Sequence, residues 1–171
     1  RNLHYLGREY LYYGRWDDCI RTLTQHLALP SAVWRDERAA SMRYIARAHA
    51  QKGERDEARD WYLRAAAEAP HLREPWVDLA MLLYEDQEWD GVLYATACAL
   101  KIRERPRTYI CEAEAWGGLP HDLRCQAYYH TGRLPQALEE ARLALAAAPS
   151  DPRLAGNTEL LEKMAGLAGE L

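Results

Sequence analysis

The chain has 171 residues, among them 28 alanines and 24 leucines but only 7 valines and isoleucines together. Alanine and leucine favour helices and β-branched residues favour sheets, so this composition excludes a sheet-rich domain and indicates an all-α fold. The net charge of −4 is too small to indicate a nucleic-acid partner, and no apolar run approaches the roughly 18 residues that a membrane span needs.

A short pattern recurs four times along the chain. Each copy begins with a large residue (an arginine in the fourth copy), a small residue follows it, and a turn comes later. The small residues are Gly7, Ala46, Ala80 and Cys125, and the turn residues are Gly14, Gly53, Gln87 and Gly132. Beyond each turn a second compact residue recurs, at Cys19, Ala58, Val92 and Ala137, and a proline ends each copy, at Pro30, Pro70, Pro106 and Pro149.

This pattern resembles the tetratricopeptide repeat, a pair of antiparallel helices called A and B. Small residues let helix A approach helix B closely, glycine suits the left-handed end of a helix, and proline stops helix B. The pattern therefore predicts one domain over 1–171, an α-solenoid with repeats over 2–30, 38–70, 73–106 and 120–149. Asp151 and Pro152 are typical of a helix start, which predicts a capping helix over 151–169.

The spacing of the small residues predicts two long connections. The intervals are 39 residues from Gly7 to Ala46, 34 from Ala46 to Ala80 and 45 from Ala80 to Cys125, and only the middle one has the standard length. We expect the extra residues around 29–34 and 108–120, the second with a short helix over 108–115. Most tryptophans fall at repeat junctions, where we expect them to pack, and Tyr62 is expected in the core.

Other segments are not specified by a generic repeat. They are Arg8-Glu9-Tyr10, Gly14-Arg15-Trp16, Ala69-Pro70, Arg73-Glu74-Pro75-Trp76, Trp116-Gly117-Gly118-Leu119-Pro120-His121-Asp122-Leu123 and Asp151-Pro152-Arg153-Leu154-Ala155-Gly156-Asn157. Together they resemble the helical region that follows the catalytic domain in certain bacterial and phage family-2-type glycosyltransferases. The resemblance spans about 3–157 and departs at His121, where that family often has an aromatic residue.

The glycosyltransferase resemblance implies an accessory role. The chemistry of that family resides in an upstream α/β domain with a metal-binding pair of aspartates, and this chain has no D-x-D triplet. The resemblance thus implies a non-catalytic module that positions an acceptor, contacts the upstream catalytic domain or forms a homodimer. The alternative is a free-standing adaptor that binds a peptide or protein. Because Arg1 and not methionine begins the chain, we expect a fragment of a longer protein or a processed product.

No constellation predicts an active site. Asp17 and Asp18 lie at a helix start, where carboxylates favour the positive end of the helix. Asp122, beside His121, is expected to cap the helix that follows Pro120. The four cysteines form no C-x-x-C pair and no cluster with histidine, which predicts free thiols, no metal, no other cofactor and a cytoplasmic location.

The A helices of such an array line its concave face, so their outward positions predict a binding groove. The candidates are His4, Arg8, Tyr12, Arg43, Arg47, Gln51, Met81, Tyr84, Glu85, Asp122, Gln126 and Tyr129, with Leu11, Val77 and His130 beside them. Arginine suits carboxylates, so one hypothesis places the acidic part of an extended peptide or acceptor near Arg8, Arg43 and Arg47. In the alternative, these arginines pair with neighbours such as Glu9 or Asp78. For self-association we expect 108–120 and 160–171 as contact surfaces.

Overall fold

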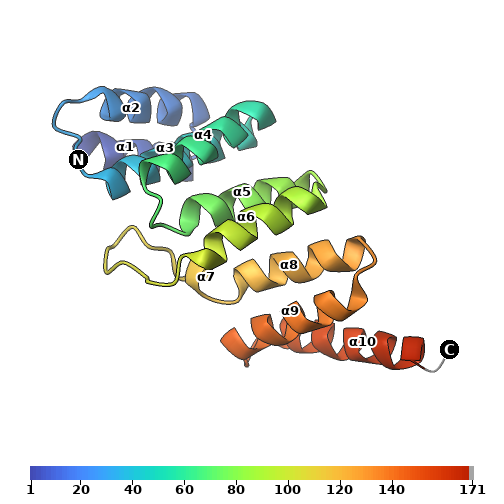
Figure 1. Ribbon diagram of the computed structural model, residues 1–171. Helices are drawn as coiled ribbons and strands as arrows, with labels where there is room; N and C mark the ends of the chain where they lie inside the picture. The colour runs from blue at the N-terminus through green and yellow to red at the C-terminus, as the bar shows by residue number, and fades with distance from the viewer. Residues whose placement is uncertain (170–171) are drawn as a thin grey trace.

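The structure is a computed structural model that describes residues 1–169, and the described part holds ten helices and no strand. The helices are α1 (Asn2–Tyr12), α2 (Trp16–Ala28), α3 (Arg35–Gln51), α4 (Arg55–Glu68), α5 (Glu74–Glu85), α6 (Trp89–Lys101), α7 (Ala113–Trp116), α8 (Leu119–His130), α9 (Leu134–Ala147) and α10 (Pro152–Gly169). They stack one after another from the N-terminus to the C-terminus (Figure 1). The all-α solenoid predicted from composition and repeat is confirmed.

The stack consists of four helix pairs and a final helix. The pairs are α1 with α2, α3 with α4, α5 with α6, and α8 with α9. Each of the four predicted repeat ranges overlaps one pair, although α3 begins three residues before the second range and α8 one residue before the fourth. Contacts of α2 with α3, α4 with α5 and α6 with α8 join the pairs, and α10 packs on α9 at the end of the stack.

Small residues bring the two helices of a pair together. A Cβ atom placed on Gly7 of α1 would lie 2.3 Å from Cδ2 of Leu23 on α2, closer than carbon atoms can approach. Ala46 and Ala80, at the equivalent positions of the second and third pairs, have no exposed surface. The alanine content of the chain thus serves close helix packing.

The turns within the pairs use the left-handed backbone region. Gly14, Gly53 and Gly132 have φ values of +69°, +79° and +75°, as the pattern predicts. Gln87 takes the same place in the third pair with a φ of +56°, although it carries a Cβ. The turn geometry is therefore kept where the glycine is missing, at a steric cost.

One of the two predicted helix caps is present. The Asp151 Oδ1 accepts a hydrogen bond of 2.9 Å from the backbone N–H of Arg153, so Asp151 caps α10 as expected. The capping role of Asp122 was wrong, because α8 begins at Leu119, after Gly118, and Asp122 lies inside its first turn. Asp122 instead pairs with Arg153 of α10 at 2.7 Å.

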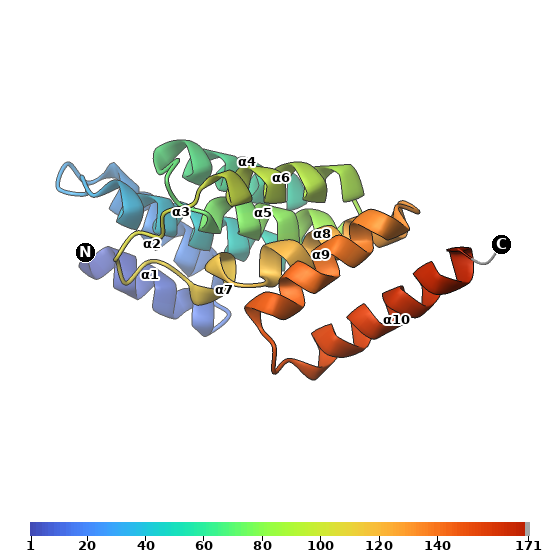
Figure 2. The same ribbon diagram turned by 60° about the horizontal axis from the view of Figure 1, so that its bottom comes forward.

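The long connection between α6 and α8 folds back over the array. The connection contains a short helix, as predicted, but not over 108–115: residues 102–112 are not helical, and α7 spans only Ala113–Trp116. Ile110, only 5% exposed, belongs to the core cluster that contains Leu11 of α1 and Tyr44 of α3. The connection reaches back to the first two pairs (Figure 2) and forms part of the core.

Tyr62, Trp61 and the cysteines lie in the array as the sequence predicts. Tyr62 is 4% exposed and lies in the core, and Trp61 contacts three of the core clusters. The four cysteines are free thiols, and burial raises the pKa of the Cys125 thiol to about 11. Within residues 1–169, no helix has both the length and the apolar composition to cross a lipid bilayer.

Candidate functional site

A cleft of about 450 Å³ opens on the face formed by α1, α3 and α5, the first helices of their pairs. The lining residues are Leu11, Tyr12, Trp16, Arg47, Ala50, Gln51, Arg55, Tyr62, Val77, Asp78, Met81, Leu82, Glu85, Glu112, Glu114, Ala115 and Leu119. Three A helices form one side of the cleft, and the connection with α7 and the start of α8 forms another. This face thus holds a concave surface built from segments far apart in the sequence.

The cleft combines apolar and polar side chains. Of its lining residues, Leu11 and Val77 are buried, whereas Met81 is 36% exposed and Tyr12 is 69% exposed. Exposed apolar and tyrosine side chains that line a concave surface can pack against a few side chains of a bound peptide. The cleft therefore has the chemical character of a binding site.

An ion-pair network forms part of the cleft wall, because Arg47, Asp78 and Glu112 belong to the lining. Arg43 has no exposed surface; its Nε donates to Oδ2 of Asp78 at 2.9 Å, and its Nη2 lies 2.9 Å from Oε2 of Glu112. Arg47 donates from Nη2 to the same two carboxylates, at 3.0 Å and 2.9 Å. Burial by itself raises the pKa of the Asp78 carboxyl, but Arg43 and Arg47 hold it below its ordinary value. These guanidinium groups are therefore bound to carboxylates of the same chain.

The connection is anchored at both ends of its inner segment. Oε1 of the buried Glu74 accepts hydrogen bonds from the backbone N–H of Glu112 at 2.9 Å and from Nε1 of Trp116 at 2.8 Å. At the other end, the Tyr109 hydroxyl donates to Glu37 at 3.0 Å. The connection thus covers the N-terminal parts of α3 and α5, and the cleft stays open beside their C-terminal ends.

Five of the twelve candidate residues line the cleft. They are Tyr12, Arg47, Gln51, Met81 and Glu85. Leu11 and Val77, which accompanied the candidates, line it as well. The structure therefore brings together candidates from the first three repeats, and their role in binding stays a prediction.

The other seven candidates lie elsewhere. His4 and Arg43 are buried, with 1% and 0% exposure, so their expected position on the open surface was wrong. Arg8 lies over the rings of Tyr5 and Tyr12 and pairs with Glu9 at 3.5 Å. The remaining four belong to other contacts or to α8 outside the cleft, and they are Tyr84, Asp122, Gln126 and Tyr129. The pairing of arginines with Glu9 and Asp78, which the alternative anticipated, is present in the structure.

The repeat pattern does not predict the contribution of the connection to the cleft. Glu112, Glu114 and Ala115 line it from a segment that belongs to no repeat. The only signal was the length of the interval from Ala80 to Cys125, which shows extra residues but not where they fold. From the sequence, Asp78 is predicted only as a pairing partner of an arginine, and the pattern does not indicate Arg55.

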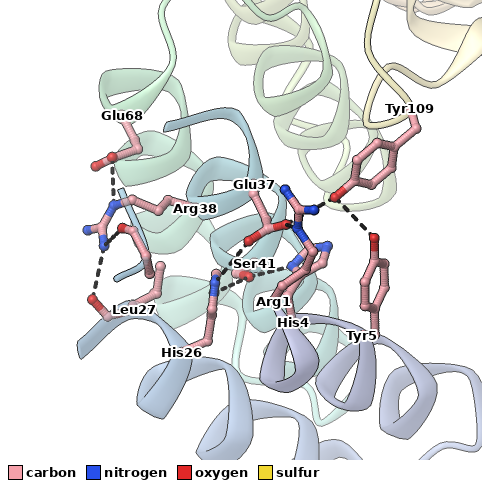
Figure 3. A network of polar contacts seen from close by, with 11 residues as sticks. Arg1, His4, Tyr5, His26, Leu27, Glu37, Arg38, Ser41, Glu68 and Tyr109 are labelled. Carbon is pink, nitrogen blue, oxygen red and sulfur yellow. Dashed lines mark hydrogen bonds and ion pairs between the residues drawn. The ribbon is translucent and has the colours of Figure 1, made fainter. Parts of the chain in front are cut away.

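A buried polar network lies near the N-terminus (Figure 3). Nδ1 of His4 lies 2.7 Å from Oγ of Ser41, Oγ lies 2.9 Å from Nδ1 of His26, and Nε2 of His26 lies 3.3 Å from Oε1 of Glu37. Tyr109 joins this network from the connection. Burial lowers the pKa of His4 to about 4 and also lowers that of His26, so both rings are neutral at pH 7.

The side chains of Ser41, His26 and Glu37 contact one another in this order. They are the residue types of a nucleophile, a base and an orienting acid. Ser41 and His26 have no exposed surface, and Glu37 is 5% exposed. A substrate cannot reach a hydroxyl with no exposed surface, so this network is structural. It fixes α1 and α2 against α3.

The two surfaces expected for self-association differ in how much of them is exposed. The connection over 108–120 packs on its own chain, with Ile110 and Ala115 buried. On α10, Leu160 is 56% exposed whereas Leu161 is 5% exposed. Glu170 and Leu171, the end of the other expected surface, lie outside the described residues.

No protein-family model matches the chain, and no curated protein matches it. Solved structures of MamA, a tetratricopeptide-like helical protein, are similar to it. One MamA crystal structure superimposes with a TM-score of 0.72 at 15% identity, covering 96% of this chain and 86% of that chain. The MamA MSR-1 structure gives 0.66 at 17% identity, over 98% and 87%. At this identity the likeness shows the fold, a tetratricopeptide-like solenoid.

Proposed function

We propose that this chain is a non-catalytic interaction module that holds an extended segment of a partner protein in the cleft on α1, α3 and α5. One observation carries the proposal: the same face already holds a non-helical segment of the chain itself, residues 109–112, and leaves an open cleft next to it. A surface that binds its own connection through side-chain anchors has the groups that a second segment needs. The tetratricopeptide-like fold supports the general role of a scaffold.

Binding of random peptides tests the proposal. A displayed library of twelve-residue peptides is selected on the immobilised protein, and enriched peptides are measured by fluorescence anisotropy. We expect the variant with Tyr12→Ala and Met81→Ala to lose at least about tenfold in affinity, because both side chains present exposed apolar surface to the cleft.

Tyr94 offers a matched control. It lies on α6, outside the cleft, and is 68% exposed, nearly the same as the 69% of Tyr12. Tyr94→Ala should leave peptide affinity unchanged. The proposal is wrong if no peptide is enriched, or if the variants at Tyr12 and Tyr94 lose affinity equally.

The module can be part of a larger enzyme or a protein of its own, and we propose both possibilities for testing. Motifs such as Trp116-Gly117-Gly118-Leu119-Pro120 support an accessory module of a glycosyltransferase that positions an acceptor or self-associates. The fold fits a free-standing adaptor as well. The gene sequence upstream of Arg1 separates them: an α/β pattern with a D-x-D triplet would support the transferase, and its absence would support the adaptor.

A further inference from the structure

The charges that line the cleft are mostly negative. Two arginines and four acidic residues contribute to the lining, and they are Arg47, Arg55, Asp78, Glu85, Glu112 and Glu114. At neutral pH this lining carries more negative than positive charge. A ligand that enters it must match this excess.

Both arginines of the lining are engaged within the chain. Arg47 binds Asp78 and Glu112. Arg55 lies 3.0 Å from Glu85 and 2.7 Å from Asp86, and it also donates to the carbonyl oxygen of Leu82 at 2.9 Å. An acidic ligand would have to displace these carboxylates, so the cleft offers it no ready partner.

Two acidic residues of the lining, Glu85 and Glu114, can accept further hydrogen bonds. Glu85 is paired with Arg55, yet its side chain is 58% exposed. Glu114 is exposed, and no ion pair joins it to another residue within the described part of the chain. A carboxylate accepts several hydrogen bonds, so these two groups can receive donors from a ligand.

Helix ends add to the negative potential. Tyr12, Gln51 and Glu85 are the last residues of α1, α3 and α5, and all three line the cleft. The C-terminal end of a helix carries a partial negative charge that favours nearby cations. Three such ends meet at this cleft.

We propose that the cleft binds a protein segment that carries a lysine or arginine flanked by apolar side chains. This inference rests on the proposed function. The apolar side chains contact Leu11, Tyr12 and Met81, and the cation is neutralised by Glu85 and Glu114. The sequence had indicated an acidic ligand near its arginines, and the charge proposed here is the opposite. Glu112 and Asp78 already pair with Arg43 and Arg47, and Arg8 pairs with Glu9.

Three nine-residue peptide libraries test the inference. They have a central lysine, glutamine or glutamate between random positions, and binding to the immobilised protein is compared at low and high salt. We expect the lysine library to bind at least about tenfold tighter than the glutamate library, with a preference that shrinks as salt screens the charges. In the variant with Glu85→Gln and Glu114→Gln this preference should disappear.

A variant with equal loss of charge elsewhere is the control. Glu57→Gln with Asp90→Asn removes two exposed carboxylates from α4 and α6, outside the cleft, and should keep the lysine preference. A preference for glutamate, no preference, or a lysine preference that survives Glu85→Gln with Glu114→Gln would overturn the inference and leave peptide binding intact. If none of the three libraries binds, the proposed function itself fails.

Discussion

Oε2 of Glu112 lies 2.9 Å from Nη2 of Arg43, a side chain with no exposed surface. The two residues are far apart in sequence, and their pairing holds the connection between α6 and α8 on the concave face. Without Glu112, the buried guanidinium would retain only Asp78 as an anionic partner.

Replacing Glu112 should loosen the connection. Because Arg43 and Arg47 both bind this carboxylate, Glu112→Gln is expected to lower the free energy of unfolding by about 2 kcal/mol. Urea unfolding followed by circular dichroism measures the change. Glu114→Gln, which removes an exposed carboxylate two residues away, should stay within about 0.5 kcal/mol of the parent. Equal effects of the two changes would contradict the anchoring role.

Stability should fall on mild acidification. In the unfolded chain His4 gains a proton below pH 6.5, whereas in the folded protein it stays neutral down to about pH 4. The unfolded state therefore binds more protons between these values. The contribution of His4 to the free energy of unfolding is fully present above pH 6.5 and decreases as the pH falls toward 4. We expect a loss on the order of 2 kcal/mol between pH 7 and pH 4.5.

The variant His4→Gln tests this dependence, because its side chain does not titrate. Urea unfolding at several pH values should give a shallower decrease between pH 6.5 and pH 4.5 than in the parent protein. If the two proteins lose stability in parallel over this range, the burial of His4 is not the cause.

Two glycines in helices should respond oppositely to alanine. Gly7→Ala places a methyl group 2.3 Å from a Leu23 carbon and should destabilise the protein by about 1–3 kcal/mol. Gly156→Ala in α10 meets no atom within 4 Å and should stabilise it by about 0.5–1 kcal/mol. Thermal unfolding of the two variants measures both effects. Stabilisation by Gly7→Ala would contradict the tight packing of α1 on α2.

The turn of the third pair offers a stabilising change. Gln87 has a φ of +56°, which costs a side-chain-bearing residue about 1 kcal/mol relative to glycine. Gln87→Gly should therefore raise the free energy of unfolding by roughly that amount. The reverse change in the second pair, Gly53→Ala at a φ of +79°, should lower it similarly. Unfolding midpoints in urea that move in the same direction for both would refute this.

The repeats could be predicted from the sequence because their signals are local. Glycine at 14, 53 and 132 has a conformational reason that acts within a few residues, and the small residues at 7, 46 and 80 act within one helix pair. The start of α10 was likewise predicted from Asp151 and its neighbour.

The cleft could be predicted only in part, because it depends on contacts between distant segments. The helical pattern places Tyr12, Gln51 and Glu85 on one face, and all three line the cleft. The pattern could not show that Arg43 is covered, since the covering residue, Glu112, lies in a segment without periodicity. The connection between α6 and α8 therefore adds acidic residues to a site that the repeat pattern alone predicts to be rich in arginine.

The hydrogen bond between the hydroxyls of Tyr5 and Tyr109, 3.4 Å long, joins positions 104 residues apart. In an ordinary repeat array each unit contacts only its neighbours, so units can unfold one by one from the ends. Here the connection ties the first two pairs to the segment that follows the third, and closing so long a loop slows folding. These three pairs are therefore expected to fold and unfold as one cooperative unit, with a fragment lacking the connection losing that cooperativity.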